Sequence, residues 1–191
     1  MSEIDLKYGR ESLPFIYNAE RFRVLEAEAG TDRPLSDVEI GAAIDEPIDS
    51  PPLEEIISPD ETILIVVSDA TRASASAQIV NLLVRRLIEL GVTPLDIDII
   101  FATGIHRAVT AEEKRELLTP FIAQRIKTLD HNADAPSMMI HLGQTQRGTP
   151  IQINRALKEH DRVILTGAIG FHYFAGFTGG RKSICPGLAS S

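Results

Sequence analysis

The sequence predicts an α/β protein with a three-layer αβα architecture, in which helices cover both faces of a Rossmann-like, mostly parallel sheet. Two observations support this fold class. Strongly apolar segments of strand length occur at residues 62–67, 97–102 and 162–166, and segments with helical spacing lie between them. Strands that alternate with helices are typical of right-handed βαβ units, which build parallel sheets.

The N-terminal part is expected to form short strands and turns over about the first forty residues, up to a Gly30-Thr31-Asp32 loop. Ser36 and Glu39 have the spacing of a capping box. A helix is therefore expected to begin there and to end before Pro47, followed by a short helical piece at 53–57.

The first strand of the sheet is expected at residues 62–67, which are apolar and largely β-branched, as in a strand buried on both faces. Apolar side chains then recur at helical spacing as far as Leu90. Ser74 or Ser76 is the candidate N-cap of this helix, and Gly91 stands where a left-handed C-terminal residue belongs.

The second half of the chain continues the pattern with a strand at 97–102. Thr110 and Glu113 form another capping box, so a helix is expected from there to about Leu118. Weaker patterns predict strands at 127–129, 138–142 and 149–153 and a short helix at 154–159, before the strong strand at 162–166.

Composition narrows the class of protein further. The 191 residues carry a net charge of −8 and are 43% hydrophobic, which suits one folded domain and not a disordered chain or a nucleic-acid binder with a basic face. No apolar run approaches the ~20 residues of a membrane span, and the acidic N-terminus is unlike a signal peptide. The single cysteine, Cys185, suits a reducing cytoplasm, and we expect it to be a small packing residue.

Three chemically rich segments each follow a predicted strand: 68–72, 103–107 and 167–182. In open α/β sheets, ligands bind outside the carboxyl ends of the strands. The three segments are therefore expected to share one edge of the sheet and to build one site.

Two histidines, His106 and His172, are expected on this edge. A pair of histidines can act as acid and base in opposite directions, which suits a reversible proton transfer. Arg72 and Arg107 are candidates to bind a small carboxylate, or they are solvated loop charges. Asp69 either accepts a hydrogen bond from a ribose hydroxyl or caps the following helix.

The glycine-rich segment predicts a ligand loop. Its glycines, interleaved with aromatic residues, let backbone N–H groups approach a phosphate closely. It differs from a P-loop because Arg181 stands where Walker A requires glycine, directly before Lys182. The like charge of Arg181 favours a nucleophilic amine at Lys182. The other histidines, His131, His141 and His160, show no metal-site spacing.

Five motifs in this order carry a family resemblance: residues 68–72 (Ser-Asp-Ala-Thr-Arg), 102–107 (Ala-Thr-Gly-Ile-His-Arg), 131–134 (His-Asn-Ala-Asp), 148–150 (Gly-Thr-Pro) with Asn154, and 172–182 with Pro186-Gly187. Together they resemble the N-terminal domain of the nickel-dependent lactate racemase family along essentially the whole chain. Departures are small: Ile105 replaces a small polar residue, and Ala108-Val109 replaces a more usual Pro-Met.

The resemblance implies an isomerase that inverts a 2-hydroxy acid through a 2-keto acid, using a nickel-pincer nucleotide joined covalently to Lys182. It implies that His106 and His172 are the acid/base pair and that Arg72 meets the substrate carboxylate. It also implies that the remaining cofactor contacts come from Asp69, Gly176, Thr178, Gly179 and Gly180. In the family the nickel-binding histidine lies beyond residue 191, so no metal ligand is expected in this chain.

The resemblance further implies that residues 1–191 are a single N-terminal cofactor and catalytic domain, with its own C-terminal domain and the cofactor-making enzymes as partners. The domain is then expected to be inactive alone. Two alternatives remain open from the residues: a phosphotransferase that binds a nucleotide phosphate in the 176–183 loop, and a catalytically inert interaction module.

Overall fold

The computed structural model describes residues 1–25, 33–72 and 74–191. Two compact units make up the chain, Met1–Pro34 and Leu35–Ser191. In the first unit, β1 (Ser2–Tyr8) and β2 (Glu11–Tyr17) form an antiparallel hairpin. The short strands expected here are confirmed, whereas the expected Gly30-Thr31-Asp32 loop lies outside the described residues.

The second unit is built around a four-stranded parallel sheet with the strand order β5-β4-β3-β8. The strands are β3 (Ile63–Ser68), β4 (Ile97–Ala102), β5 (Lys127–Leu129) and β8 (Arg162–Leu165). All four match segments predicted as strands, and the α/β class is confirmed. This order is that of half a Rossmann fold. The chain adds β4 and β5 on one side of β3 and then crosses back to add β8 on the other side, so the strand order reverses between β3 and β8.

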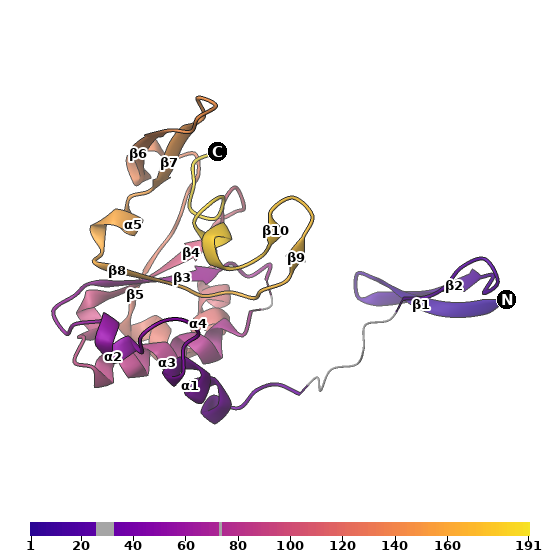
Figure 1. Cartoon of the computed structure of the whole chain (residues 1–191), viewed down its shortest axis with the longest axis horizontal. Coiled ribbons are helices and arrows are strands. Elements are labelled where there is room, and N and C mark those ends of the chain that lie inside the picture. Colours follow the sequence, from indigo (N-terminus) through magenta and orange to yellow (C-terminus); the bar gives the residue numbers. More distant parts are fainter. Residues whose placement is uncertain (26–32, 73) are drawn as a thin grey trace. The chain divides into compact units, whose positions relative to one another are not determined.

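Helices pack on one face of the sheet, as Figure 1 shows. They are α1 (Asp37–Asp45), α2 (Leu53–Ile56), α3 (Ser76–Glu89) and α4 (Ala111–Arg125). Alternate residues of the central strand, Ile63, Ile65 and Val67, are buried against this layer. The remaining residues of that strand face the other way, because successive side chains of a strand point to opposite faces.

The opposite face has a thinner cover (Figure 1). Leu64 and Val66 pack there with Ala156 of α5 (Ala156–Glu159) and with Leu188 near the C-terminus. The antiparallel hairpin of β6 (Met139–Gln144) and β7 (Pro150–Asn154) lies on the same side. These two strands were expected from the sequence, but they form a sheet of their own and do not extend the parallel one.

Two helix boundaries differ from the prediction. Neither Ser74 nor Ser76 caps α3, because its N-cap is Ala75, a non-glycine residue with a φ of 48°, and the two serine hydroxyls bond to each other at 2.7 Å. The α4 segment continues past Leu118 to Arg125 after a break at Thr119 (φ 64°, ψ 151°). Pro120 follows the break, and proline disfavours the helical region for the residue before it; the positive φ of Thr119 has no such explanation.

No helix in the described ranges is long and apolar enough to cross a membrane.

Candidate functional site

The three chemically rich segments follow β3, β4 and β8, and these strands are parallel and adjacent. Their carboxyl ends therefore lie along one edge of the sheet, as the sequence predicted. The segments after β3 and β8 lie on either side of the point where the strand order reverses. Open α/β sheets bind ligands at this point.

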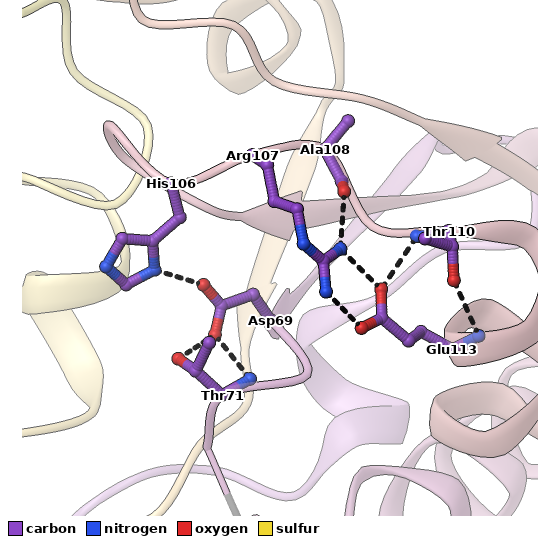
Figure 2. A network of polar contacts seen from close by, with 7 residues as sticks. All are labelled: Asp69, Thr71, His106, Arg107, Ala108, Thr110 and Glu113. Atoms are coloured by element: carbon purple, nitrogen blue, oxygen red, sulfur yellow. Dashed lines mark hydrogen bonds and ion pairs between the residues drawn. The ribbon is translucent and has the colours of Figure 1, made fainter.

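The first two segments are joined by a buried carboxylate. Oδ2 of Asp69 lies 2.6 Å from Nδ1 of His106, and Oδ1 of Asp69 accepts hydrogen bonds from the hydroxyl (2.6 Å) and the backbone N–H (3.0 Å) of Thr71 (Figure 2). Asp69 is 5% exposed. Burial alone would raise its pKa, but the bonds from Thr71 and His106 outweigh burial and lower the pKa of Asp69 below its usual range.

This geometry settles one alternative for Asp69. It does not cap α3, because no side chain caps that helix. Both carboxylate oxygens instead serve Thr71 and His106, so the residue acts on the histidine of the neighbouring loop. Sequence reasoning missed this pair, since the contact depends on β3 and β4 being neighbours.

The two arginines of the site differ in their surroundings. Arg107 makes a two-pronged ion pair with Glu113 at 2.6 and 2.8 Å and also donates to the carbonyl of Ala108 (Figure 2). Arg107 is therefore tied to the start of α4. Arg72 is exposed and forms no ion pair with the described part of the chain, so its guanidinium is available to a carboxylate.

His172 lies in a small hairpin formed by β9 (Phe171–His172) and β10 (Gly176–Phe177). Its Nδ1 accepts hydrogen bonds from the backbone N–H groups of Phe174 (3.3 Å) and Ala175 (3.2 Å). Gly176 permits the tight turn with a φ of 79°. Among the described contacts, no hydrogen bond or ring contact joins His172 to His106.

The aromatic side chains of this hairpin are exposed to solvent. Phe171, Tyr173 and Phe174 are each more than four-fifths exposed, and Phe177 is 58% exposed. The Tyr173 ring stacks on that of His172, with centroids 5.3 Å apart.

Lys182 lines a pocket of about 200 Å³ with Ala175, Phe177, Gly179, Arg181 and Cys185. Neither Lys182 nor Arg181 has an ion-pair partner in the described structure. The pocket therefore carries two uncompensated positive charges beside one aromatic ring, which suits an anionic ligand with a flat ring. The packing role expected for Cys185 is wrong, because its side chain is exposed.

The glycine-rich loop is held from within. The hydroxyl of Thr178 donates to the carbonyl of Ala168 at 2.7 Å. Gly179 has a φ of 72°, and a Cβ at this position would lie 3.1 Å from the same carbonyl oxygen, so the close approach of the two backbone segments requires glycine. Gly180 also has a positive φ and opens a 3₁₀ helix, Gly180–Ser183.

This loop is not a P-loop in structure. A P-loop leads directly into an α-helix whose N-terminus faces the phosphate. Here the segment after Gly179 is only the four-residue 3₁₀ helix, and Ser183 at its end is buried.

Sequence reasoning also missed a set of contacts that fixes the chain after Lys182. The N–H of Gly104 donates to the carbonyl of Gly187 at 2.8 Å, and buried His131 lies between Asn154 and the carbonyl of Ala189, each at 3.2 Å. The only indication in the sequence was that Gly104, His131, Asn154 and Gly187 belong to the five motifs of the family resemblance. The bond between Gly104 and Gly187 ties the segment after Lys182 to the loop that carries His106.

Comparison with known proteins decides the family. The sequence profile described as "Lactate racemase N-terminal domain" matches residues 8–191. The chain belongs to the lactate racemase N-terminal domain family.

Two lactate racemases show the extent of the similarity. The enzyme of Lactiplantibacillus plantarum is 36% identical over 194 residues, and that of Thermoanaerobacterium thermosaccharolyticum is 30% identical over 193. Each alignment covers all of this chain but 45% of the relative, so the chain spans less than half the length of these racemases.

Solved structures agree with this family. The lactate racemase apoprotein of Thermoanaerobacterium thermosaccharolyticum matches 99% of this chain and 44% of its own, with a TM-score of 0.85 and 29% identity. A Thermotoga maritima protein shares the fold over 83% of this chain and 39% of its own, with a TM-score of 0.68 and 24% identity.

The described residues contain no cluster of three or more histidine, cysteine, aspartate or glutamate side chains that could hold a metal ion.

Proposed function

We propose that this chain is the cofactor-bearing part of a racemase or epimerase of 2-hydroxy acids that uses a nickel-pincer nucleotide attached to Lys182. Membership of the lactate racemase N-terminal domain family supports the reaction class. The observation that carries the proposal is the Asp69–His106 pair on the same edge of the sheet as an unpaired lysine in a pocket.

The charges that line the pocket support this proposal. Lys182 is half-buried, has no ion-pair partner among the described residues, and lines the pocket, where its Nζ can reach a reactive group of the ligand. Arg181 offers a charge to a phosphate, and Phe177 offers a flat surface to an aromatic ring. Asp69, Gly176, Thr178, Gly179 and Gly180 would complete the surroundings of the cofactor.

Substrate binding and proton transfer would be carried out by residues of this chain. Arg72, without an ion pair, would bind the substrate carboxylate and hold the carbon above the edge of the sheet. His106, held by Asp69, would accept the proton of the substrate hydroxyl at Nε2. His172 would stand on the other side of the substrate carbon. When bound, the nucleotide supplies the acceptor and donor for the hydrogen on that carbon.

The wider setting follows from the same proposal. The substrate is a small 2-hydroxy acid, with lactate as the simplest case, because the two relatives are lactate racemases. The partners are a C-terminal domain and the enzymes that make the cofactor, and neither a nucleic acid nor a membrane is involved. A chain with one exposed cysteine suits the reducing cytoplasm.

The first test is the intact mass of the chain when it is produced together with the cofactor-making enzymes. We expect a covalent nucleotide adduct on the unchanged chain and no adduct on Lys182→Ala. Lys158→Ala, which changes a lysine of α5 outside the pocket, is the matched control and should carry the full adduct. An unmodified mass for the unchanged chain contradicts the attachment.

The second test concerns turnover. Residues 1–191 replace the matching part of the Lactiplantibacillus plantarum enzyme, and interconversion of lactate enantiomers is followed by chiral chromatography. We expect activity from the chimera and none from residues 1–191 alone, because the relatives are more than twice as long as this chain. Activity in a chimera that carries His106→Ala, His172→Ala and Lys182→Ala together would support the inert interaction module.

A further inference from the structure

The two histidines of the site are hydrogen-bonded in opposite senses through the same ring atom. Nδ1 of His106 faces the carboxylate oxygen of Asp69 at 2.6 Å, and an ionised carboxylate only accepts hydrogen bonds. Nδ1 of His172 faces the backbone N–H groups of Phe174 and Ala175, and a backbone N–H only donates.

We propose that the neutral rings are fixed in opposite tautomers, so that His106 presents a lone pair at Nε2 and His172 presents an N–H at Nε2. The assignment of catalytic roles to these tautomers rests on the proposed racemase function. The positioning groups are Asp69 for His106, and the turn at Phe174 and Ala175 for His172.

The two histidines differ in their readiness to accept a proton at Nε2. When a substrate hydroxyl gives its proton to Nε2 of His106, the O–H bond breaks, an N–H bond forms, and the resulting imidazolium pairs with Asp69. Asp69 is itself supported by two bonds from Thr71, so the carboxylate stays in place for this step. His106 is therefore the ready proton acceptor.

His172 starts from the other state. If the neutral ring released its Nε2 proton while Nδ1 carried none, the product would be an imidazolate anion, which is not accessible near neutral pH. To exchange a proton at Nε2, the ring first needs a proton on Nδ1, and that proton would face the N–H groups of Phe174 and Ala175. The hairpin turn must therefore release Nδ1 before His172 takes part in proton transfer.

Nuclear magnetic resonance of the chain with ¹⁵N-labelled histidine tests the assignment directly. Long-range proton–nitrogen correlations distinguish the protonated ring nitrogen from the one with a lone pair, and His106→Gln and His172→Gln identify the signals. At a pH where both rings are neutral, we expect the proton on Nδ1 of His106 and on Nε2 of His172.

The variant Asp69→Asn should change the tautomer of His106 alone, because an asparagine amide can donate to Nδ1 and loss of the carboxylate partner favours the other tautomer. Glu61→Gln is the matched control: it neutralises a carboxylate that pairs with Arg162, outside the loop that carries His106, and should leave His106 unchanged. If Asp69→Asn does not fold, Thr71→Val, which removes a bond to Asp69, should weaken the preference in the same direction.

Two rings in the same tautomer overturn this inference, as does an Asp69→Asn protein in which His106 is unchanged. These results are independent of whether Lys182 carries the cofactor, so failure of the proposed function is read separately from the mass of the adduct. In the active chimera, Asp69→Asn should lower kcat roughly 100-fold with a smaller change in KM, as expected for a misoriented proton acceptor.

Discussion

At the scale of single residues, His131 shows how burial and hydrogen bonding act together. The residue is 3% exposed, and its two ring nitrogens lie at 3.2 Å from the amide of Asn154 and the carbonyl of Ala189. Burial lowers the pKa of His131 below its usual value of 6.5, although the bond to Ala189 acts in the opposite direction. The folded protein therefore favours the neutral ring more than the unfolded chain does.

This shift predicts a loss of stability in mild acid. The unfolded chain takes up the proton more readily than the folded one, so the contribution of His131 is complete above pH 6.5 and declines as the pH falls below that value. We expect the free energy of unfolding to fall by up to about 1.4 kcal/mol per pH unit more than in His131→Asn. Urea unfolding of both proteins at about pH 7.5 and pH 5.5 measures the difference, and parallel pH profiles would contradict the prediction.

Gly187 illustrates a glycine that is required by space and not by its backbone angles. A Cβ there would lie 2.4 Å from the carbonyl oxygen of Ser183. We expect Gly187→Ala to destabilise the protein by roughly 3 kcal/mol or more. Gly148→Ala is the control, because Gly148 has a φ of 79° but open space around it, and should cost roughly 1–2 kcal/mol. Chemical denaturation compares the two variants; equal costs would show that the segment around Gly187 relaxes.

At the scale of elements, Glu113 has two functions at the start of α4. Its side chain accepts from the backbone N–H of Thr110 at 2.8 Å, as the capping box predicted, and it also pairs with Arg107. The pKa of Glu113 is lowered to about 2, mainly by the hydrogen bond from Arg107 and next by the bond from the backbone of Thr110. The helix start and the loop that carries His106 are therefore fixed by the same carboxylate.

We expect Glu113→Gln to lower the unfolding temperature by roughly 2–5 °C at neutral pH, because it weakens both interactions. The pKa of this carboxyl is below its unfolded value of 4.5, so its contribution is present above pH 4.5 and is lost as the pH falls toward 2. Thermal melts of both proteins at about pH 7, 4.5 and 3 test this: the difference should shrink below pH 4.5. A constant difference would show that the charge of Glu113 has no part in it.

The elements were largely predictable because their signals are local. The two capping boxes and the apolar strands of the central sheet lie close to where the sequence placed them. The misses have non-local or steric causes. The left-handed N-cap at Ala75 has no sequence signature, and the antiparallel pairing of β6 with β7 depends on a hairpin that leaves the parallel sheet.

At the scale of the whole molecule, every residue of the two buried clusters lies in the second unit, between Leu53 and Leu188. We therefore expect deletion of residues 1–34 to leave the cooperative unfolding of the second unit within a few degrees of that of the whole chain, since an isolated two-stranded hairpin adds little stability. Calorimetry of the whole chain and of the shortened one tests this. A loss of the transition would show that the hairpin stabilises the second unit.

The site was predictable only as an edge of the sheet. The rule that parallel strands present their carboxyl ends together placed Asp69, His106 and Lys182 in one region. The partners of each side chain were not predictable, because they depend on strand order: Asp69 reaches His106 only because β3 and β4 are adjacent. The pairing of Arg107 with Glu113, in contrast, was within reach of the sequence, six residues apart.

The exposed thiol of Cys185 offers a single position for chemical labelling of this site. It is the one cysteine of the 191 residues, and it lines the same pocket as Lys182. A fluorophore coupled there through a maleimide would attach at a single known position, without any engineered substitution. Its emission would report the filling of the pocket in real time, before any turnover is measured.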